Sequence, residues 1–149
     1  MKFKKNFILS LFTVLSLFLY SCGYTPIYSS NKSLFKVNNI TYENNKYNRW
    51  VAKSIKSISN DQAQKVIDLE INTIRKKKTV AKNSSGDPEI FELIIDVEVT
   101  IDDKKKLFVQ SQKYNNSANK FDLRKYEIEI EKQMVDKIIN ELILYLTQD

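Results

Sequence analysis

A stretch of alternating apolar and polar residues in the middle of the chain most constrains its fold. Apolar side chains occupy every second position from Phe91 to Ile101, and polar residues fill most positions between them, with Ile94 as the exception. The same alternation covers residues 67–73. A period of two is the repeat of a β-strand with one buried face. The chain must therefore build a sheet and supply other elements to cover its apolar side.

Turn signals divide this central region into consecutive strands. The cluster Asn, Ser, Ser, Gly, Asp, Pro at 83–88 ends a strand that begins at Lys65 and runs to Val80. A polar turn at 102–105 precedes a returning strand over 107–114. Residues 34–42 carry β-branched and aromatic side chains and predict an earlier strand. We therefore expect four strands, of which the last three form an antiparallel meander.

Two segments have the spacing of amphipathic helices. Asn44 or Asn45 can cap a helix that ends near Asn60, and Asp122 can cap a long final helix. On the final helix we assign Glu127 and Glu131 to the solvent side. The order β-α-β-β-β-α predicts an α+β fold, a two-layer sandwich with two helices packed on one face of a four-stranded, mostly antiparallel sheet. The other sheet face is expected to be polar and to face solvent or a partner.

The N-terminus has the form of a lipoprotein signal peptide. A basic start is followed by an uncharged, mostly apolar run over 7–20, which is too short to span a bilayer. Leu19-Tyr20-Ser21-Cys22 then reads as a lipobox, with Cys22 as the lipid attachment site. We predict a signal peptide over 1–21, a lipidated tether over 22–33 and one domain over 34–149. Gly23, where an aspartate would favour retention in the inner membrane, favours a periplasm-facing position on the outer membrane of a Gram-negative cell.

Composition excludes several classes of function. Removal of the first 21 of the 149 residues leaves 128, and it lowers the formal net charge from +6 to +3, which weakens a nucleic-acid interpretation. The chain has no histidine, and its single cysteine is expected to carry lipid. Disulfides, the common nucleophile–base pairs and zinc sites are therefore not expected. We predict that the protein is not an enzyme and uses no cofactor or metal.

Basic residues form the sharpest remaining signal. Arg75 to Lys78 are contiguous, and in a strand Lys76 and Lys78 share one face. Such a run either binds an anionic ligand or keeps an edge strand from pairing, and the sequence leaves both open. Lys82 lies at the 81–88 turn, and Arg124 and Lys125 begin the last helix. These three cations, with Lys120, would form one patch if the 115–121 loop lies at the same end of the sheet as that turn.

The residues that follow the lipobox resemble a known family. Cys22-Gly23-Tyr24-Thr25-Pro26-Ile27-Tyr28 is similar to the start of alphaproteobacterial LptE lipoproteins, and the later hairpin and Lys/Glu-rich final helix follow the family's order. The resemblance implies two helices on a four-stranded sheet. It further implies an outer-membrane lipoprotein that plugs and supports assembly of the LptD β-barrel and helps deliver lipopolysaccharide to the outer leaflet.

The resemblance also implies where lipopolysaccharide would bind. In the family, basic residues near the loop between the second and third strands and near the start of the final helix are expected to contact it. Those positions are Lys82 and Arg124 or Lys125 here, and Lys76 and Lys78 are further candidates. Lipid A phosphates attract such cations. The alternative is a generic membrane-tethered periplasmic adaptor or ligand-binding lipoprotein unrelated to lipopolysaccharide.

Overall fold

The computed structural model describes residues 35–148. The predicted signal peptide, the lipid attachment at Cys22 and the tether therefore lie outside the described residues. The elements are β1 (Phe35–Tyr42), α2 (Lys46–Ile58), β2 (Lys65–Lys82), β3 (Pro88–Ile101), β4 (Lys104–Asn115) and α3 (Lys120–Gln148). Their order confirms the predicted β-α-β-β-β-α arrangement and the α+β fold class.

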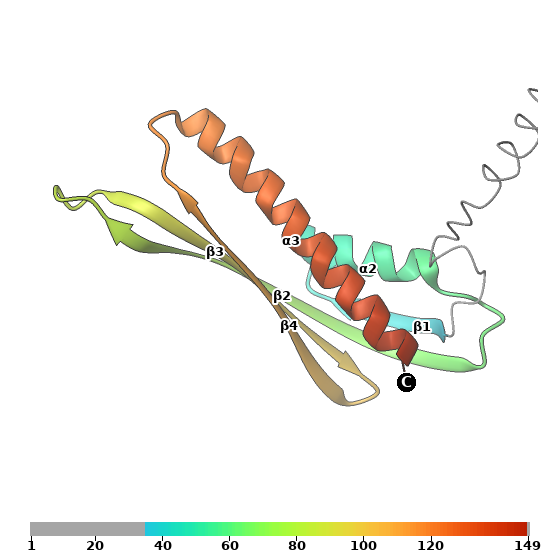
Figure 1. Ribbon diagram of the computed structural model, residues 1–149. Coiled ribbons are helices and arrows are strands. Elements are labelled where there is room, and N and C mark those ends of the chain that lie inside the picture. The colour runs from blue at the N-terminus through green and yellow to red at the C-terminus, as the bar shows by residue number, and fades with distance from the viewer. Residues whose placement is uncertain (1–34, 149) are drawn as a thin grey trace, which may run out of the picture. The chain divides into compact units, whose positions relative to one another are not determined.

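The four strands form one mixed sheet in the order β1-β2-β3-β4 (Figure 1). β1 pairs with β2 in parallel, and α2 makes the crossover that a parallel pair requires. β2, β3 and β4 pair antiparallel, which confirms the predicted meander. Three of the four strands are therefore arranged as hairpins, and only β1 is added through a helix.

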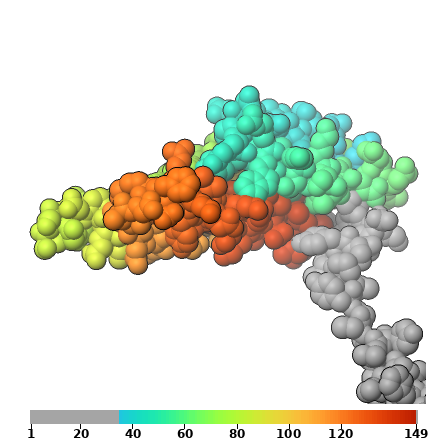
Figure 2. Space-filling model, turned by 90° about the horizontal axis from the view of Figure 1, so that it is seen from above, coloured from blue at the N-terminus to red at the C-terminus, as the bar shows by residue number. Residues whose placement is uncertain are grey.

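Both helices cover one face of the sheet, and the core lies between the layers (Figure 1). Alternate residues of β2 and β3 point into this core, and the helices contribute an apolar stripe each. The side chains that are fully buried include Phe35, Val51, Ile55, Leu93, Ile95, Val97, Val99, Val135, Ile138 and Leu142. Burial of each such side chain contributes about 1.5–3 kcal/mol. Viewed from the helix side, α2 and α3 lie side by side, and the β2–β3 turn is left uncovered (Figure 2).

An asparagine caps each helix. Asn45 accepts hydrogen bonds from the backbone N–H groups of Tyr47 and Asn48, which confirms the predicted cap of α2. The predicted cap of α3 at Asp122 is wrong, because the helix begins at Lys120 and Asn119 takes that role. The Asn119 Oδ1 accepts from the N–H groups two and three residues on, at 3.0 and 3.3 Å. Asp122 lies in the first turn, where its charge favours the helix dipole.

β2 is much longer than its parallel partner. β1 ends at Tyr42, which lies opposite Ile71, whereas β2 continues to Lys82. Within residues 35–148, the second half of β2 is therefore paired only with β3 and has one open edge. The run Arg75–Lys78 lies along this edge, as expected of lysines that discourage edge-to-edge pairing.

The sheet face opposite the helices is less polar than expected. Ile74, Leu107 and Val109 lie on it and are 47%, 57% and 48% exposed. Ile74 and Val109 flank Asp96 in one cross-strand row, and Leu107 lies opposite Glu98 in the next. The prediction of a polar outer face is therefore wrong for the centre of the sheet, where Ile74 of β2 and Leu107 and Val109 of β4 lie among the outward-facing residues.

The β3–β4 turn contains two aspartates with left-handed backbones. Asp102 and Asp103 have φ angles of 45° and 71°, and they join strands paired directly from Ile101 to Lys104. A two-residue hairpin turn with positive φ at both positions is the type I′ turn, which favours asparagine and glycine. Two non-glycine residues therefore adopt a conformation that costs free energy here.

Replacement of Asp103 by glycine should stabilise the domain. Asp103→Gly removes the Cβ crowding of the left-handed backbone, and we expect the free energy of unfolding to rise by about 0.5–1 kcal/mol in urea denaturation. Asp61→Gly, in a turn without positive φ, is the matched control and should be neutral or destabilising. A loss of stability in the Asp103 variant would contradict a strained turn.

Candidate functional site

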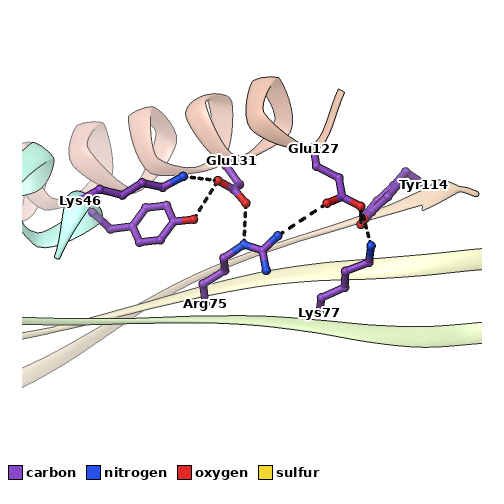
Figure 3. A network of polar contacts seen from close by, with 7 residues as sticks. Lys46, Arg75, Lys77, Tyr114, Glu127 and Glu131 are labelled. Atoms are coloured by element: carbon purple, nitrogen blue, oxygen red, sulfur yellow. Dashed lines mark hydrogen bonds and ion pairs between the residues drawn. The ribbon is translucent and has the colours of Figure 1, made fainter. Parts of the chain in front are cut away.

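The buried carboxylate of Glu131 on α3 forms ion pairs with cations from two other elements, α2 and β2 (Figure 3). The Glu131 side chain is only 7% exposed. Its Oε2 accepts hydrogen bonds from the Lys46 ammonium and the Tyr47 hydroxyl, each at 2.8 Å, and its Oε1 accepts from the Arg75 Nε. The contacts join α2, β2 and α3. Glu131 therefore fixes the two helices and the central strand to one another.

A second carboxylate repeats the arrangement one helical turn earlier. Glu127 Oε1 accepts from the Lys77 ammonium at 2.6 Å and from the Tyr114 hydroxyl at 2.7 Å, and Arg75 reaches Oε2 at 3.8 Å (Figure 3). The Lys77 ammonium also lies 3.9 Å from the centroid of the Phe91 ring. Strand β4 is thereby tied to α3 as well. We call these seven polar residues the α3 charge network: Lys46, Tyr47, Arg75, Lys77, Tyr114, Glu127 and Glu131.

The network keeps its acids ionised. Burial alone would raise the pKa of Glu131, but hydrogen bonds from Lys46, Tyr47 and Arg75 outweigh it and hold the pKa below its usual value. The pKa of Glu127 is lowered in the same way, against its burial, by Lys77 and Tyr114. Burial and the Glu127 carboxylate together raise the pKa of the Tyr114 phenol. The two carboxylates of the network are therefore charged groups whose hydrogen-bond partners compensate their burial.

The basic run of β2 is divided between two faces. Arg75 and Lys77 point to α3 and are committed to the α3 charge network. On the opposite face, the Lys76 ammonium pairs with Asp96 at 2.7 Å. Lys78 is exposed, and among residues 35–148 it makes no ion pair or side-chain hydrogen bond. Of the two candidates on this strand, only Lys78 thus presents a cation without a carboxylate partner in the described part of the chain.

The other candidates lie at one end of the sheet. Asn116, in the loop before α3, donates its backbone N–H to Glu89 O and its side-chain amide to Pro88 O, both at 2.7 Å. This loop and the β2–β3 turn therefore share an end, as predicted. Lys82, Arg124 and Lys125 are all exposed there, but no hydrogen bond or ion pair among the described residues joins the turn to the helix cations.

The Lys120 side chain makes hydrogen bonds to the loop that precedes α3. Its ammonium donates to Asn116 Oδ1 and to Ser117 O, both at 3.1 Å. It therefore fastens the loop to the first turn of α3, and we leave it out of the candidate patch. The candidate cations at this end are then Lys82 on the sheet and Arg124 and Lys125 on the helix.

Within the described residues, no three histidine, cysteine, aspartate or glutamate side chains are grouped closely enough to hold a metal ion. In the same part of the chain, no helix combines the length and the apolar composition of a membrane span.

The α3 charge network was not predicted from the sequence, although the signal for it is present. Arg75 and Lys77 continue the phase of the buried positions 67–73, so they had to point at the helix layer. The assignment of Glu127 and Glu131 to the solvent side of α3 is wrong, because Glu131 is 6% exposed, the Glu127 side chain is 14% exposed, and both bind side chains of the sheet. The sequence pattern that indicates such a network is a set of charged residues at positions that continue the buried face of a strand, with opposite charges on the helix that packs against that face.

Comparison of the fold with solved structures finds bacterial lipoproteins. An uncharacterized lipoprotein B from Nitrosomonas europaea has a TM-score of 0.56 at 17% identity, covering 76% of this chain and 83% of its own. A putative lipoprotein from Caulobacter crescentus has a TM-score of 0.54 at 10% identity, with 81% and 93% covered. The rare lipoprotein B from Shewanella oneidensis has a TM-score of 0.50 at 17% identity, with 72% and 92% covered.

These likenesses establish a shared fold. No protein-family model matches the chain, and no curated protein matches it by sequence. The domain therefore has the architecture of several bacterial lipoproteins, at identities that carry no residue-level correspondence.

The α3 charge network should make stability depend on acid pH. The pKa values of Glu127 and Glu131 are lower in the folded state than in the unfolded chain, where glutamate titrates near 4.3. The unfolded state therefore binds more protons as pH falls. The contribution is complete above about pH 5–6 and is lost as pH falls through 4.3 toward the folded pKa values. Urea denaturation between pH 7 and pH 3 measures this loss.

The variant Glu131→Gln isolates the effect. We expect it to be about 2 kcal/mol less stable at pH 7, because charge-assisted hydrogen bonds are lost, and to lose less stability on acidification. Glu129→Gln, at an exposed position of the same helix, should keep the wild-type pH profile. An unchanged profile in the Glu131 variant would contradict the role assigned to this carboxylate.

Proposed function

We propose that this protein is an outer-membrane lipoprotein, anchored through lipid on Cys22, that plugs and supports assembly of an LptD-type β-barrel and helps deliver lipopolysaccharide. The observation that carries the proposal is the pairing of a lipobox, followed by Gly23-Tyr24-Thr25-Pro26, with a domain whose fold is that of bacterial lipoproteins. Two acyl chains on the cysteine would anchor the domain stably at a bilayer surface.

Lipopolysaccharide is proposed to bind at one end of the domain. The ligand cations are Lys82 from the β2–β3 turn and Arg124 and Lys125 from the start of α3, all exposed. A guanidinium can hold a lipid A phosphate through two parallel hydrogen bonds, whereas the ammonium of Lys82 acts as a point charge. Lys78 lies on the same hairpin and extends the positive surface, while Lys76 contributes less because Asp96 neutralises it.

The domain is proposed to act by binding and not by catalysis. The α3 charge network is fully paired, so it serves the fold, whereas Lys82, Arg124 and Lys125 are exposed. Such a surface attracts an anionic amphiphile and is weakened by salt. Membrane anchorage then holds this surface close to where the barrel and the lipid meet.

A triple charge reversal tests the ligand site. We expect Lys82→Glu with Arg124→Glu and Lys125→Glu to weaken lipopolysaccharide binding by about tenfold or more while changing the melting temperature little, because the three side chains are exposed. Isothermal titration calorimetry measures the first quantity. Lys104→Glu with Lys132→Glu and Lys137→Glu changes net charge equally at exposed sites elsewhere and should bind normally. Undiminished binding by the first variant would show that these three residues do not form the lipopolysaccharide site.

Depletion tests the barrel partnership. When the protein is depleted from the cell, mature barrel and surface lipopolysaccharide should fall together, because the plug supports barrel assembly. Restoration by the wild-type chain, and not by Cys22→Ala, would show that lipid attachment is needed. Unchanged barrel and lipopolysaccharide levels would favour the alternative of a generic membrane-tethered adaptor.

A further inference from the structure

A groove of about 380 Å³ runs between α2 and the outer edge of β1. Its apolar lining includes Val37 and Ile40 from the strand and Ala52 from the helix. β1 is the first strand of the sheet, and within residues 35–148 no other strand pairs with its outer side. The groove therefore combines an open strand edge with a helix that overhangs it.

Only the beginning of this edge is covered. Val37 N–H donates to the Ser59 hydroxyl at 2.8 Å, and Phe35 O accepts from Asn60 N–H at 3.1 Å. Both partners belong to the chain that leaves α2. A β-bulge follows at position 38, and from there to Tyr42 the described residues supply no further partner on that side. The edge of β1 from position 38 to Tyr42 is thus left available for hydrogen bonding.

Three cations line the helix side of the groove. Arg49, Lys53 and Lys56 are exposed, lie on one face of α2 and belong to the groove lining. Arg49 donates to Asn44 Oδ1 at 3.1 Å, and none of the three has a carboxylate partner among the described residues. Other surface cations of the domain, such as Lys36 and Lys105, are paired with acids. The groove is therefore a concave positive site.

We propose that this groove binds an acidic, extended segment of a partner protein, which adds as a strand to the edge of β1. Successive side chains on one face of a strand are about 6.8 Å apart. Arg49 and Lys53 are separated by about 6 Å along the helix axis. Carboxylates at alternate positions of an added strand would therefore meet successive cations of α2, while the backbone supplies the hydrogen bonds.

The charge of the groove selects this occupant over the chain's own upstream segment. Residues 23–34 contain no aspartate or glutamate. A phosphate or an anionic lipid headgroup could satisfy the cations but would leave the β1 edge unpaired. The proposal is independent of lipopolysaccharide and of the barrel, since neither enters its test.

Hydrogen exchange with defined peptides tests the proposal on the full chain held in detergent. The probe is a capped peptide of four Glu-Val repeats, and the matched probe is four Glu-Pro repeats, which keep the charge but lack half of the backbone donors. We expect the Glu-Val peptide to bind and to slow amide exchange within residues 38–42. The Glu-Pro peptide should bind at least about tenfold more weakly and leave exchange unchanged.

Variants and simple anions complete the design. Lys53→Glu with Lys56→Glu should weaken Glu-Val binding about tenfold, and Lys132→Glu with Lys137→Glu, on the exposed side of α3, should not. Inorganic phosphate and phosphatidylglycerol vesicles should leave exchange at 38–42 unchanged. Equal binding of both peptides, protection of β1 by phosphate or vesicles, or no peptide binding would each overturn the proposal.

Discussion

The position of the helix layer depends on the charge of Glu131. A carboxylate whose side chain is 7% exposed must have its charge compensated, and Lys46, Tyr47 and Arg75 supply the compensation from α2 and β2. Arg75 and Lys77 lie on one strand face, where such neighbours are about 6.8 Å apart, and their acids Glu127 and Glu131 lie about 6 Å apart along the helix. The two spacings match, so a slip of α3 along the sheet would separate both pairs at once.

The need to compensate the charges of Glu127 and Glu131 explains the role of the basic run Arg75–Lys78 in this domain. The cations that face the helices are consumed by the fold, and one of the outward pair is neutralised by Asp96. Cations without a carboxylate partner among the described residues therefore include Lys78 on this strand, those at the end of the sheet, and those along the outer face of α2. The long β2–β3 hairpin depends on the same network, because β1 stops at Tyr42 and β2 continues beside α3 without it.

Local sequence patterns predicted much of the fold but did not predict the charge pairing between residues far apart in the chain. Alternation predicted the strands, and the asparagine before α2 predicted its start, because both signals act between near neighbours in the chain. The α3 cap was misplaced by three residues, since Asn119 and Asp122 are both good capping residues and only the loop geometry decides between them. Glu131 was misassigned because a buried acid is uncommon unless it has partners, and its partners are 56 and 85 residues away. The groove along β1 depends on which strand ends at the sheet edge, and the sequence does not specify that.

A double-mutant cycle on Arg75 and Glu131 tests most directly whether this pair organises the domain. Methionine at each position removes the charge while keeping a side chain of considerable length. Arg75→Met leaves Glu131 with Lys46 and Tyr47, and Glu131→Met leaves Arg75 with Glu127, so the cycle isolates the contact between Arg75 and Glu131. If the pair organises the domain, each single variant is clearly destabilised, and the double variant is more stable than the sum of the two predicts, with a coupling of about 1–3 kcal/mol. Effects that add to within about 0.5 kcal/mol would contradict a structural role for the pair.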